Sequence, residues 1–220
     1  VEFGYRYLET DVHLSSDGVL FSFHDDTLDR VTDGTGVPEQ LPWTELSRVR
    51  VAGQDPIPTM DELFESLPGA RFNIDLKVPQ AIEPLARAIE AHRAHDRVCV
   101  GSFSRASIHA FRRLVGTRVA TASGSLGVAG YAFAPGLRRV VRSPGVALQL
   151  PVRAWHDRVP LISRGLVSAA HAAGRVVHVW TVNERAEMER LIDLGVDGLV
   201  SDRIDLLAAV LVEHGLWEGN

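Results

Sequence analysis

Five residues of this 220-residue chain have side chains that could do chemistry together: Glu9, Asp11, His24, Asp75 and Lys77. The three carboxylates supply only oxygen ligands, which suit a hard cation such as Mg²⁺ or Ca²⁺ much better than a structural zinc. A histidine can act as general acid or base near neutral pH, and a lysine can stabilise an anionic transition state. We therefore predict that Glu9, Asp11 and Asp75 hold one divalent cation and that His24 and Lys77 serve phosphoester chemistry.

Each of these residues also has a simpler explanation. Glu9 and Asp11 alternate along one stretch and could form the solvent face of a strand. A histidine such as His24 is more often a hydrogen-bonded structural residue, and its position beside two carboxylates favours function here. Asp75 and Lys77 lie inside the apolar stretch FNIDLKV. Charges inside a short apolar strand are rarely buried without a purpose, which favours a functional role.

The elements that must position these residues follow from the periodicity of the chain. Helical patterns alternate with strands from residue 71 onward, which indicates parallel pairing and right-handed crossovers. This predicts an α/β fold, a TIM-like (β/α)8 barrel, in which polar residues such as Ser102, Gln149 and Trp180 at strand ends meet at one face. We expect strands at 7–14, 19–24, 71–77, 97–103, 117–122, 145–150, 175–182 and 196–201, and helices at 59–67, 80–94, 104–114, 160–173, 184–194 and 203–214.

Local signals refine this arrangement. A turn centred near Ser16 and Asp17 would make 7–24 a hairpin and place His24 across from Glu9, with Asp11 on the same face. Residues 26–58 contain many Gly and Pro residues and little periodicity, so they are predicted to form a long excursion beside the site.

Two helix starts and one helix end carry capping signals. Thr59 and Glu62 form the pattern of a capping box, and Asn183 is predicted to cap the start of the helix at 184–194. Gly195 is predicted to end that helix.

The composition limits the possible partners. An apolar content of 45% supports a single domain over residues 1–220. A net charge of −5 without a long basic run argues against nucleic acid or an anionic membrane as the main partner. The single cysteine, Cys99, excludes an intramolecular disulfide, and no apolar run reaches the length of a transmembrane helix. A small phosphate-bearing molecule remains compatible, because a bound cation can supply positive charge locally.

Several motifs together resemble the glycerophosphodiester phosphodiesterase family. They are YLETDVHLSSDGVLFSFHDDTLDRVTDGTG, NIDLK, GSFS, VHVWTVN and GVDGLVSDRID, and they follow in the order and spacing of that family over essentially the whole chain. The resemblance implies a TIM-like barrel that hydrolyses glycerophosphodiesters to glycerol 3-phosphate and an alcohol with one divalent cation, Mg²⁺ or Ca²⁺, in lipid and glycerol metabolism.

The resemblance also assigns residue roles. Glu9 and Asp11 match the family's metal-binding Glu-x-Asp, whereas Asp75 stands where the family usually has Glu, one methylene longer. His24 matches one of two catalytic histidines, and Lys77 matches a lysine two residues after the third ligand.

Two further residues are expected to bind the substrate. Trp180 matches the aromatic residue that packs against the glycerol side of the substrate. Gln149, at the end of its strand, is expected to bind substrate as well.

One departure from the family concerns the start of the chain. The family's first strand, which ends in His-Arg-Gly and carries the other catalytic histidine, is missing from the sequence as given, which begins at Val1. We therefore expect an N-terminally truncated domain, and the chain as given could be inactive. For the same reason the compartment is open, with the cytoplasm favoured and secretion still possible.

Two alternative functions stay open. One is a lipid-directed phosphodiesterase acting on lysophospholipids or sphingomyelin, for which Leu126, Tyr131 and Phe133 could line an apolar pocket mouth or merely cover the barrel. The other is a catalytically impaired form that binds a phosphate ligand. The released alcohol, the choice between Mg²⁺ and Ca²⁺, and the oligomeric state are left undetermined by the sequence.

Overall fold

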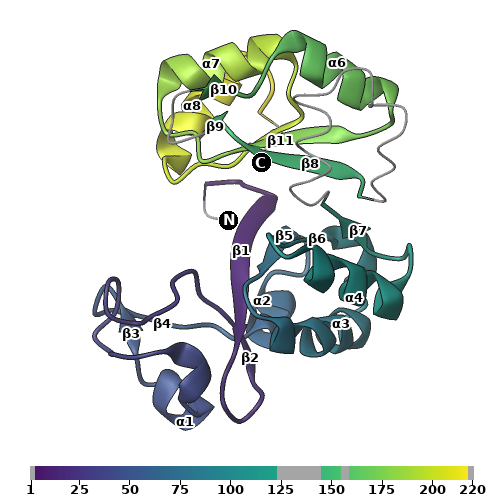
Figure 1. Cartoon of the computed structure of the whole chain (residues 1–220). Helices are drawn as coiled ribbons and strands as arrows, with labels where there is room; N and C mark the ends of the chain where they lie inside the picture. Colours follow the sequence, from purple (N-terminus) through teal and green to yellow (C-terminus); the bar gives the residue numbers. More distant parts are fainter. Residues whose placement is uncertain (1–2, 123–144, 155–158, 218–220) are drawn as a thin grey trace. The chain divides into compact units, whose positions relative to one another are not determined.

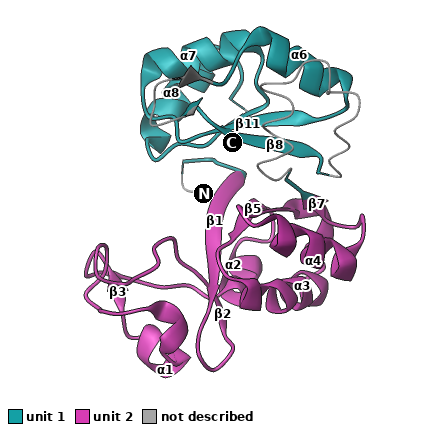
Figure 2. Ribbon diagram, in the orientation of Figure 1, with its two compact units in different colours: residues 1–6, 121–220 teal, residues 7–120 magenta. Residues whose placement is uncertain are grey.

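A computed structural model describes residues 3–122, 145–154 and 159–217. The chain divides into two compact units, unit 1 with residues 1–6 and 121–220, and unit 2 with residues 7–120 (Figure 2). The organisation as a single domain stays a prediction, and each unit is described by itself.

Unit 2 holds a mostly parallel sheet with helices along one face (Figure 1). Strand β1 pairs in parallel with β5, β5 pairs in parallel with β6, and the short β2 runs antiparallel to β1. Its elements are β1 (Tyr7–Leu14), β2 (Leu20–Ser22), η1 (Pro38–Gln40), α1 (Trp43–Leu46), β3 (Arg50–Val51), β4 (Asp55–Pro56), α2 (Met60–Ser66), β5 (Arg71–Leu76), η2 (Pro79–Ala81), α3 (Ile82–Ala91), η3 (His95–Arg97), β6 (Val98–Gly101), α4 (Arg105–Val115) and β7 (Ala120–Thr121), the last at the boundary between the units.

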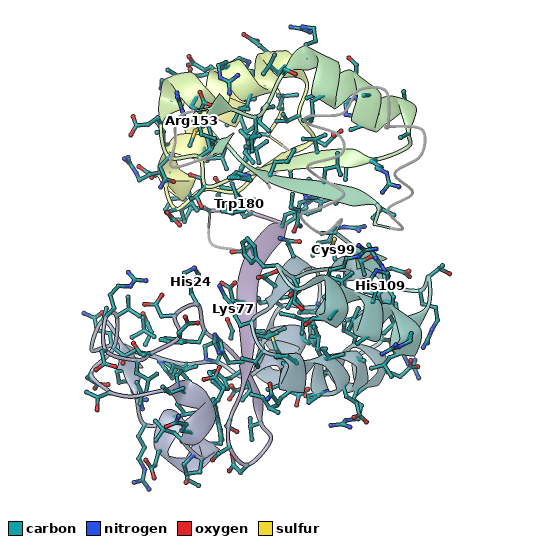
Figure 3. All side chains as sticks on the ribbon, viewed as in Figure 1. His24, Lys77, Cys99, His109, Arg153 and Trp180 are labelled. Carbon is teal, nitrogen blue, oxygen red and sulfur yellow. The ribbon has the colours of Figure 1, made fainter. Side chains whose placement is uncertain are left out.

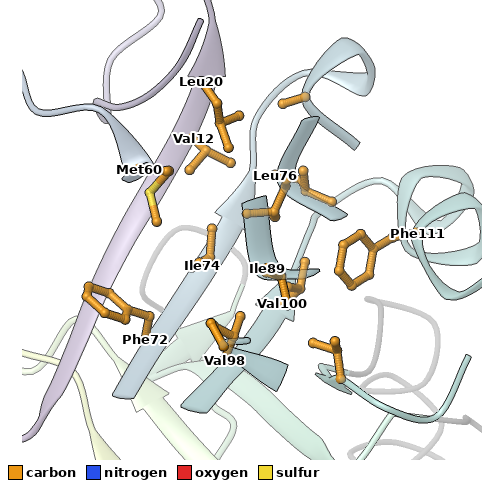
Figure 4. Packing of buried hydrophobic residues seen from close by; sticks show 14 of the residues in the cluster. Val12, Leu20, Met60, Phe72, Ile74, Leu76, Ile89, Val98, Val100 and Phe111 are labelled. Carbon is orange, nitrogen blue, oxygen red and sulfur yellow. The ribbon is translucent and has the colours of Figure 1, made fainter. Parts of the chain in front are cut away.

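The core of unit 2 explains which strand positions face which way. Every second residue of β5, namely Phe72, Ile74 and Leu76, is buried against α2, α3 and α4 (Figure 4). Val12 of β1 joins the same cluster. Because side chains alternate across a strand, the residues between these positions must face the opposite side of the sheet.

The excursion at 26–58 is more regular than its sequence suggests. It contains η1, α1 and the two-stranded β3–β4 ribbon. A small apolar cluster holds it against β2, formed by Phe21, Phe23, Leu28, Leu46 and Ile57. Elements of two to four residues are too short to show a periodic pattern, which is why the sequence predicted none.

Unit 1 repeats the plan of a sheet with helices on one side. Its parallel sheet has the order β12–β11–β8, and Leu148, Val177 and Val179 pack under α6, α7 and α8. Its elements are β8 (Ala147–Pro151), β9 (Arg153–Ala154), β10 (Val159–Pro160), α6 (Arg164–Ala172), β11 (Val176–Trp180), α7 (Arg185–Leu194), β12 (Gly198–Leu199) and α8 (Ile204–Glu213).

The predicted strands and helices all occur, several of them shorter than expected. The capping box of Thr59 and Glu62 and the left-handed C-cap at Gly195 are confirmed. The predicted N-cap at Asn183 is wrong: Glu184 holds that position without a side-chain cap. Asn183 is used elsewhere, since its amide oxygen accepts hydrogen bonds from the Ser201 hydroxyl and the Asp202 backbone N–H. None of the helices within the described ranges is long and apolar enough to cross a membrane.

Candidate active site

The charged residues of unit 2 form a row across two parallel strands. Asp11 of β1 is the register partner of Asp75 of β5, and Glu9 is the partner of Asn73. All four alternate with core-facing residues, so they share the face of the sheet that the helices leave uncovered. The structure therefore places the three carboxylates that the sequence predicted as metal ligands on one face of the sheet.

This gathering of carboxylates changes their acidity. Loss of water around Asp75, and then repulsion from the Asp11 carboxylate, raise the pKa of Asp75 to about 6. Desolvation likewise raises the pKa of Glu9 to about 7, and repulsion from Asp11 and Asp75 adds to the shift. Part of Glu9 is exposed, but the surrounding protein atoms displace water from its carboxylate. Like charges opposite one another on neighbouring strands repel. Ionisation of all three carboxylates is therefore unfavourable unless a positive charge lies nearby.

Lys77 supplies part of that charge. It follows β5 directly, and its backbone N–H donates to the carbonyl of Val12, which extends the pairing of the two strands. Its Nζ lies 3.0 Å from Oδ1 of Asp11, which is only 7% exposed. The prediction that Lys77 lies beside the carboxylates is thus supported by its position, and its partner is Asp11.

The three carboxylates are oxygen ligands of the kind that a hard cation prefers, although they are not gathered into a complete metal site among the described residues. Within the described ranges, no three His, Cys, Asp or Glu side chains are close enough to form a ready metal cage. Glu9 lies about 7 Å along the strand from Asp11, and Lys77 occupies one oxygen of Asp11. The residues fit a divalent cation because they are oxygen donors whose mutual repulsion a cation would relieve.

The position of His24 in the hairpin differs from the predicted one. The turn covers residues 15–19 and is centred on Asp17, because the Ser15 backbone N–H donates to the Val19 carbonyl. Val12 pairs with Ser22 and Leu14 with Leu20, so continuing this register would place His24 opposite Thr10. The expected pairing of His24 with Glu9 is therefore wrong by one residue. Strand β2 ends at Ser22, which frees His24 from the alternation of the sheet.

His24 and Lys77 nevertheless line one cavity of about 390 Å³, together with Asp25, Asp26, Thr27 and Arg30 (Figure 3). The His24 ring is 72% exposed. A histidine that is open to solvent beside a lysine and an acidic row can exchange protons with a bound molecule.

A chain of hydrogen bonds fixes the ring of His24. Its Nδ1 lies 2.6 Å from Oδ1 of Asp25. Arg30 grips the same carboxylate with two donors, Nε to Oδ2 at 2.6 Å and Nη2 to Oδ1 at 2.7 Å. These bonds, first from Arg30 and then from His24, hold the pKa of Asp25 well below its usual range.

Asp25 and Arg30 are thus parts of the site to which the sequence analysis assigned no role. The spacing within HDDTLDR indicates their role, because in a short loop an aspartate can contact both the histidine before it and an arginine five residues after it.

Two other polar residues near the strand ends have structural roles. His13 is only 1% exposed, stacks on Phe21 and contacts Glu39 of η1 through Nδ1. It ties the excursion to β1. The hydroxyl of Ser102 donates to the Leu76 carbonyl at 2.9 Å, which joins the end of β6 to the end of β5.

The predicted substrate-binding residues lie in unit 1. Gln149 of β8 is the register partner of His178 of β11, and Trp180 lies two residues beyond His178, so Gln149 and Trp180 share one face of this sheet. Both are half-buried. Leu126, Tyr131 and Phe133 lie outside the described residues.

Fold and site together define an α/β protein whose sheet carries carboxylates, a lysine and an oriented histidine at its polar face. The sequence model of the "Glycerophosphoryl diester phosphodiesterase family" matches residues 1–206. The chain therefore belongs to this family.

A curated relative supports this assignment. The Mycobacterium tuberculosis protein named "Probable glycerophosphodiester phosphodiesterase 2" is 39% identical over 227 residues, which covers 98% of this chain and 83% of that protein.

Solved structures confirm the fold. A phosphodiesterase from Oleispira antarctica, in complex with the product sn-glycerol-3-phosphate, gives a TM-score of 0.80 at 23% identity over 96% of this chain and 87% of its own. A glycerophosphodiester phosphodiesterase from Agrobacterium tumefaciens gives a TM-score of 0.77 at 25% identity over 94% and 88%. The predicted class, an α/β fold of the TIM-like barrel type, is confirmed by these similarities.

Proposed function

We propose that the protein hydrolyses glycerophosphodiesters to glycerol 3-phosphate and an alcohol. The observation that carries this proposal is the pairing of Asp11 with Asp75 in register, with Lys77 beside them and His24 in the adjoining cavity. The family of the chain and the 39% identical relative support the same chemistry.

The carboxylates are assigned to cation binding. Glu9, Asp11 and Asp75 would hold one Mg²⁺ or Ca²⁺, which as a Lewis acid would polarise an oxygen of the substrate phosphate. The supporting observation is that the pKa values of Glu9 and Asp75 are raised by desolvation and mutual repulsion, which a bound cation would offset.

The remaining residues handle protons, charge and position. His24 would transfer a proton at Nε2, because Nδ1 is engaged by Asp25. As the P–O bond to the alcohol breaks, the leaving oxygen must gain a proton and the incoming water must lose one. Lys77 would stabilise the negative charge on the phosphate. Trp180 and Gln149 would contact the substrate, as the resemblance to the family implies for Trp180.

The test is release of glycerol 3-phosphate from glycerophosphocholine by the natural protein, with and without EDTA. We expect turnover that EDTA abolishes and that added Mg²⁺ or Ca²⁺ restores. Turnover that survives EDTA would refute the cation assignment and keep the hydrolase. No turnover with either cation would refute the hydrolase.

Two added arms separate the other functions. Faster hydrolysis of lysophosphatidylcholine or sphingomyelin than of glycerophosphocholine would indicate a lipid-directed enzyme. Tight binding of glycerol 3-phosphate without turnover of any of the three substrates would indicate a binding protein.

A further inference from the structure

Resting on the proposed function, we infer that Asp25 and Arg30 act as positioning residues that hold the His24 ring in the tautomer with its proton on Nδ1. The contacts that carry this inference are those of one short loop. The Asp25 carboxylate receives Nδ1 of His24 and both Nε and Nη2 of Arg30 at 2.6 to 2.7 Å.

The direction of the hydrogen bond follows from charge. Two donors from an arginine keep Asp25 ionised, and an ionised carboxylate can only accept. Nδ1 must therefore be the donor. The neutral ring then has its lone pair on Nε2, which makes Nε2 the nitrogen that can accept and return a proton.

Burial adds to this control. The Asp25 side chain is 14% exposed, whereas those of His24 and Arg30 are 72% and 68% exposed. The carboxylate thus lies between two more exposed side chains and can orient both. Without it the His24 ring would be free to turn about its side-chain bonds.

The same three side-chain types meet at a second place in unit 2, which provides a matched control. Arg118 donates to Oε2 of Glu90 at 2.7 Å, and Nε2 of His95 lies 3.2 Å from the same oxygen. There the carboxylate is 61% exposed, and the arginine also contacts the histidine nitrogen. This second cluster lies at the end of α3 and has no part in the proposed chemistry.

The decisive variant is Asp25→Ala, which removes the carboxylate that Nδ1 of His24 and both donors of Arg30 share. The ring proton is then no longer held on Nδ1, and the ring can turn and take either tautomer. We expect kcat to fall by about 10² to 10⁴, the range of a lost proton-transfer catalyst, with KM changed much less.

Asp25→Asn should keep much of the activity. Oδ1 of Asp25 accepts from both Nδ1 of His24 and Nη2 of Arg30, so an amide oxygen at that position can accept from both. We expect Asp25→Asn to be at least about tenfold faster than Asp25→Ala, and Arg30→Ala to lose only several-fold. Glu90→Gln should behave like the unsubstituted protein.

The tautomer itself is measured by ¹⁵N NMR of the histidine ring nitrogens, with His24 assigned by its absence in His24→Gln. We expect Nδ1 to be protonated in the unsubstituted protein and in Asp25→Asn, and a substantial share of the form protonated on Nε2 in Asp25→Ala. An unchanged tautomer in Asp25→Ala, or an Asp25→Asn protein no faster than Asp25→Ala, would overturn the inference. If the unsubstituted protein shows no turnover, the proposed function fails, and the NMR result still decides the positioning role.

Discussion

The two units use the same sheet design for different chemistry. In unit 2 the polar positions between the core residues of β1 and β5 carry Glu9, Asp11 and Asp75. In unit 1 the equivalent positions of β8 and β11 carry the neutral side chains of Gln149 and Trp180, together with His178. Burial lowers the pKa of His178, which favours its neutral form, whereas it raises the pKa values of Glu9 and Asp75.

The comparison shows what charge adds to a sheet face. A neutral half-buried face can pack against other side chains or bind a ligand without a compensating charge. A face with three carboxylates is unfavourable until protons, Lys77 or a cation offset their repulsion. Such cost is typical of functional sites.

The largest expected effect on activity comes from replacing a charged residue on the sheet of unit 2 with a neutral one. Asp75→Asn removes one predicted cation ligand with little change in size. We expect kcat/KM for glycerophosphocholine to fall by about 10² or more, because a Lewis-acid cation contributes several kcal/mol.

The same substitution should raise stability when the cation is absent, since it also removes repulsion from Asp11. The urea midpoint in EDTA measures this. Asp55→Asn, on the exposed β4, is the matched control and should change neither quantity. An Asp75→Asn protein with normal activity would remove Asp75 from the site.

The second effect concerns pH. The folded protein binds a proton at Asp75 more tightly than the unfolded chain does, because the pKa of Asp75 is raised to about 6. Stability in EDTA should therefore fall as pH rises from about 4 to about 6. Glu9, with a pKa of about 7, should extend the fall toward neutral pH.

The contribution of Asp75 to this fall is about 2 kcal/mol after allowance for solvent screening. Urea unfolding at about pH 3.5 and about pH 7.5, on either side of this fall, would measure it. Added Mg²⁺ should flatten the dependence by stabilising the ionised carboxylates. Stability that rises with pH over this window in EDTA would contradict the assignment.

How much of this site was predictable depends on the range of the interactions. Alternation along β1 predicted that Glu9 and Asp11 share one face, and the barrel pattern predicted Asp75 at a neighbouring strand end. The parallel register places Asp75 opposite Asp11. An alternating pattern involves only residues that are close in the chain, so it can be recognised in the sequence. The capping box at Thr59 was predictable for the same reason.

The parts that were mispredicted depend on turn geometry and on contacts distant in sequence. One residue more in the turn at 15–19 changed the partner of His24 from Glu9 to Thr10, because a shift of one residue exchanges the two faces of a strand. Contacts of this kind are not visible in the local sequence: the buried His13 contacts Glu39, which lies 26 residues away.

The third effect tests the neutral face. Trp180→Ala should raise KM for glycerophosphocholine by about tenfold and leave kcat within a few-fold, because an aromatic contact that binds substrate and transition state equally affects only KM. This outcome would assign Trp180 to substrate binding. A loss in kcat as large as that of Asp75→Asn would show that Trp180 acts in the transition state as well.

The smallest effect concerns how closely the neutral face is packed. Gly198 of β12 is the register partner of His178, and a Cβ at Gly198 would lie 2.9 Å from Cδ2 of the His178 ring. We expect Gly198→Ala to lower the free energy of unfolding by about 1 kcal/mol, at the low end for overpacking because His178 is only half-buried and can turn.

The double variant Gly198→Ala/His178→Ala separates this clash from other effects of the glycine. Its free energy of unfolding should equal that of His178→Ala alone, because removing the ring removes the atom that the new methyl group meets. Urea midpoints of the three variants measure the coupling. Equal destabilisation by Gly198→Ala with and without the His178 ring would instead assign the loss of stability to the backbone of β12. The His178 ring would then not be what limits the size of the side chain at position 198.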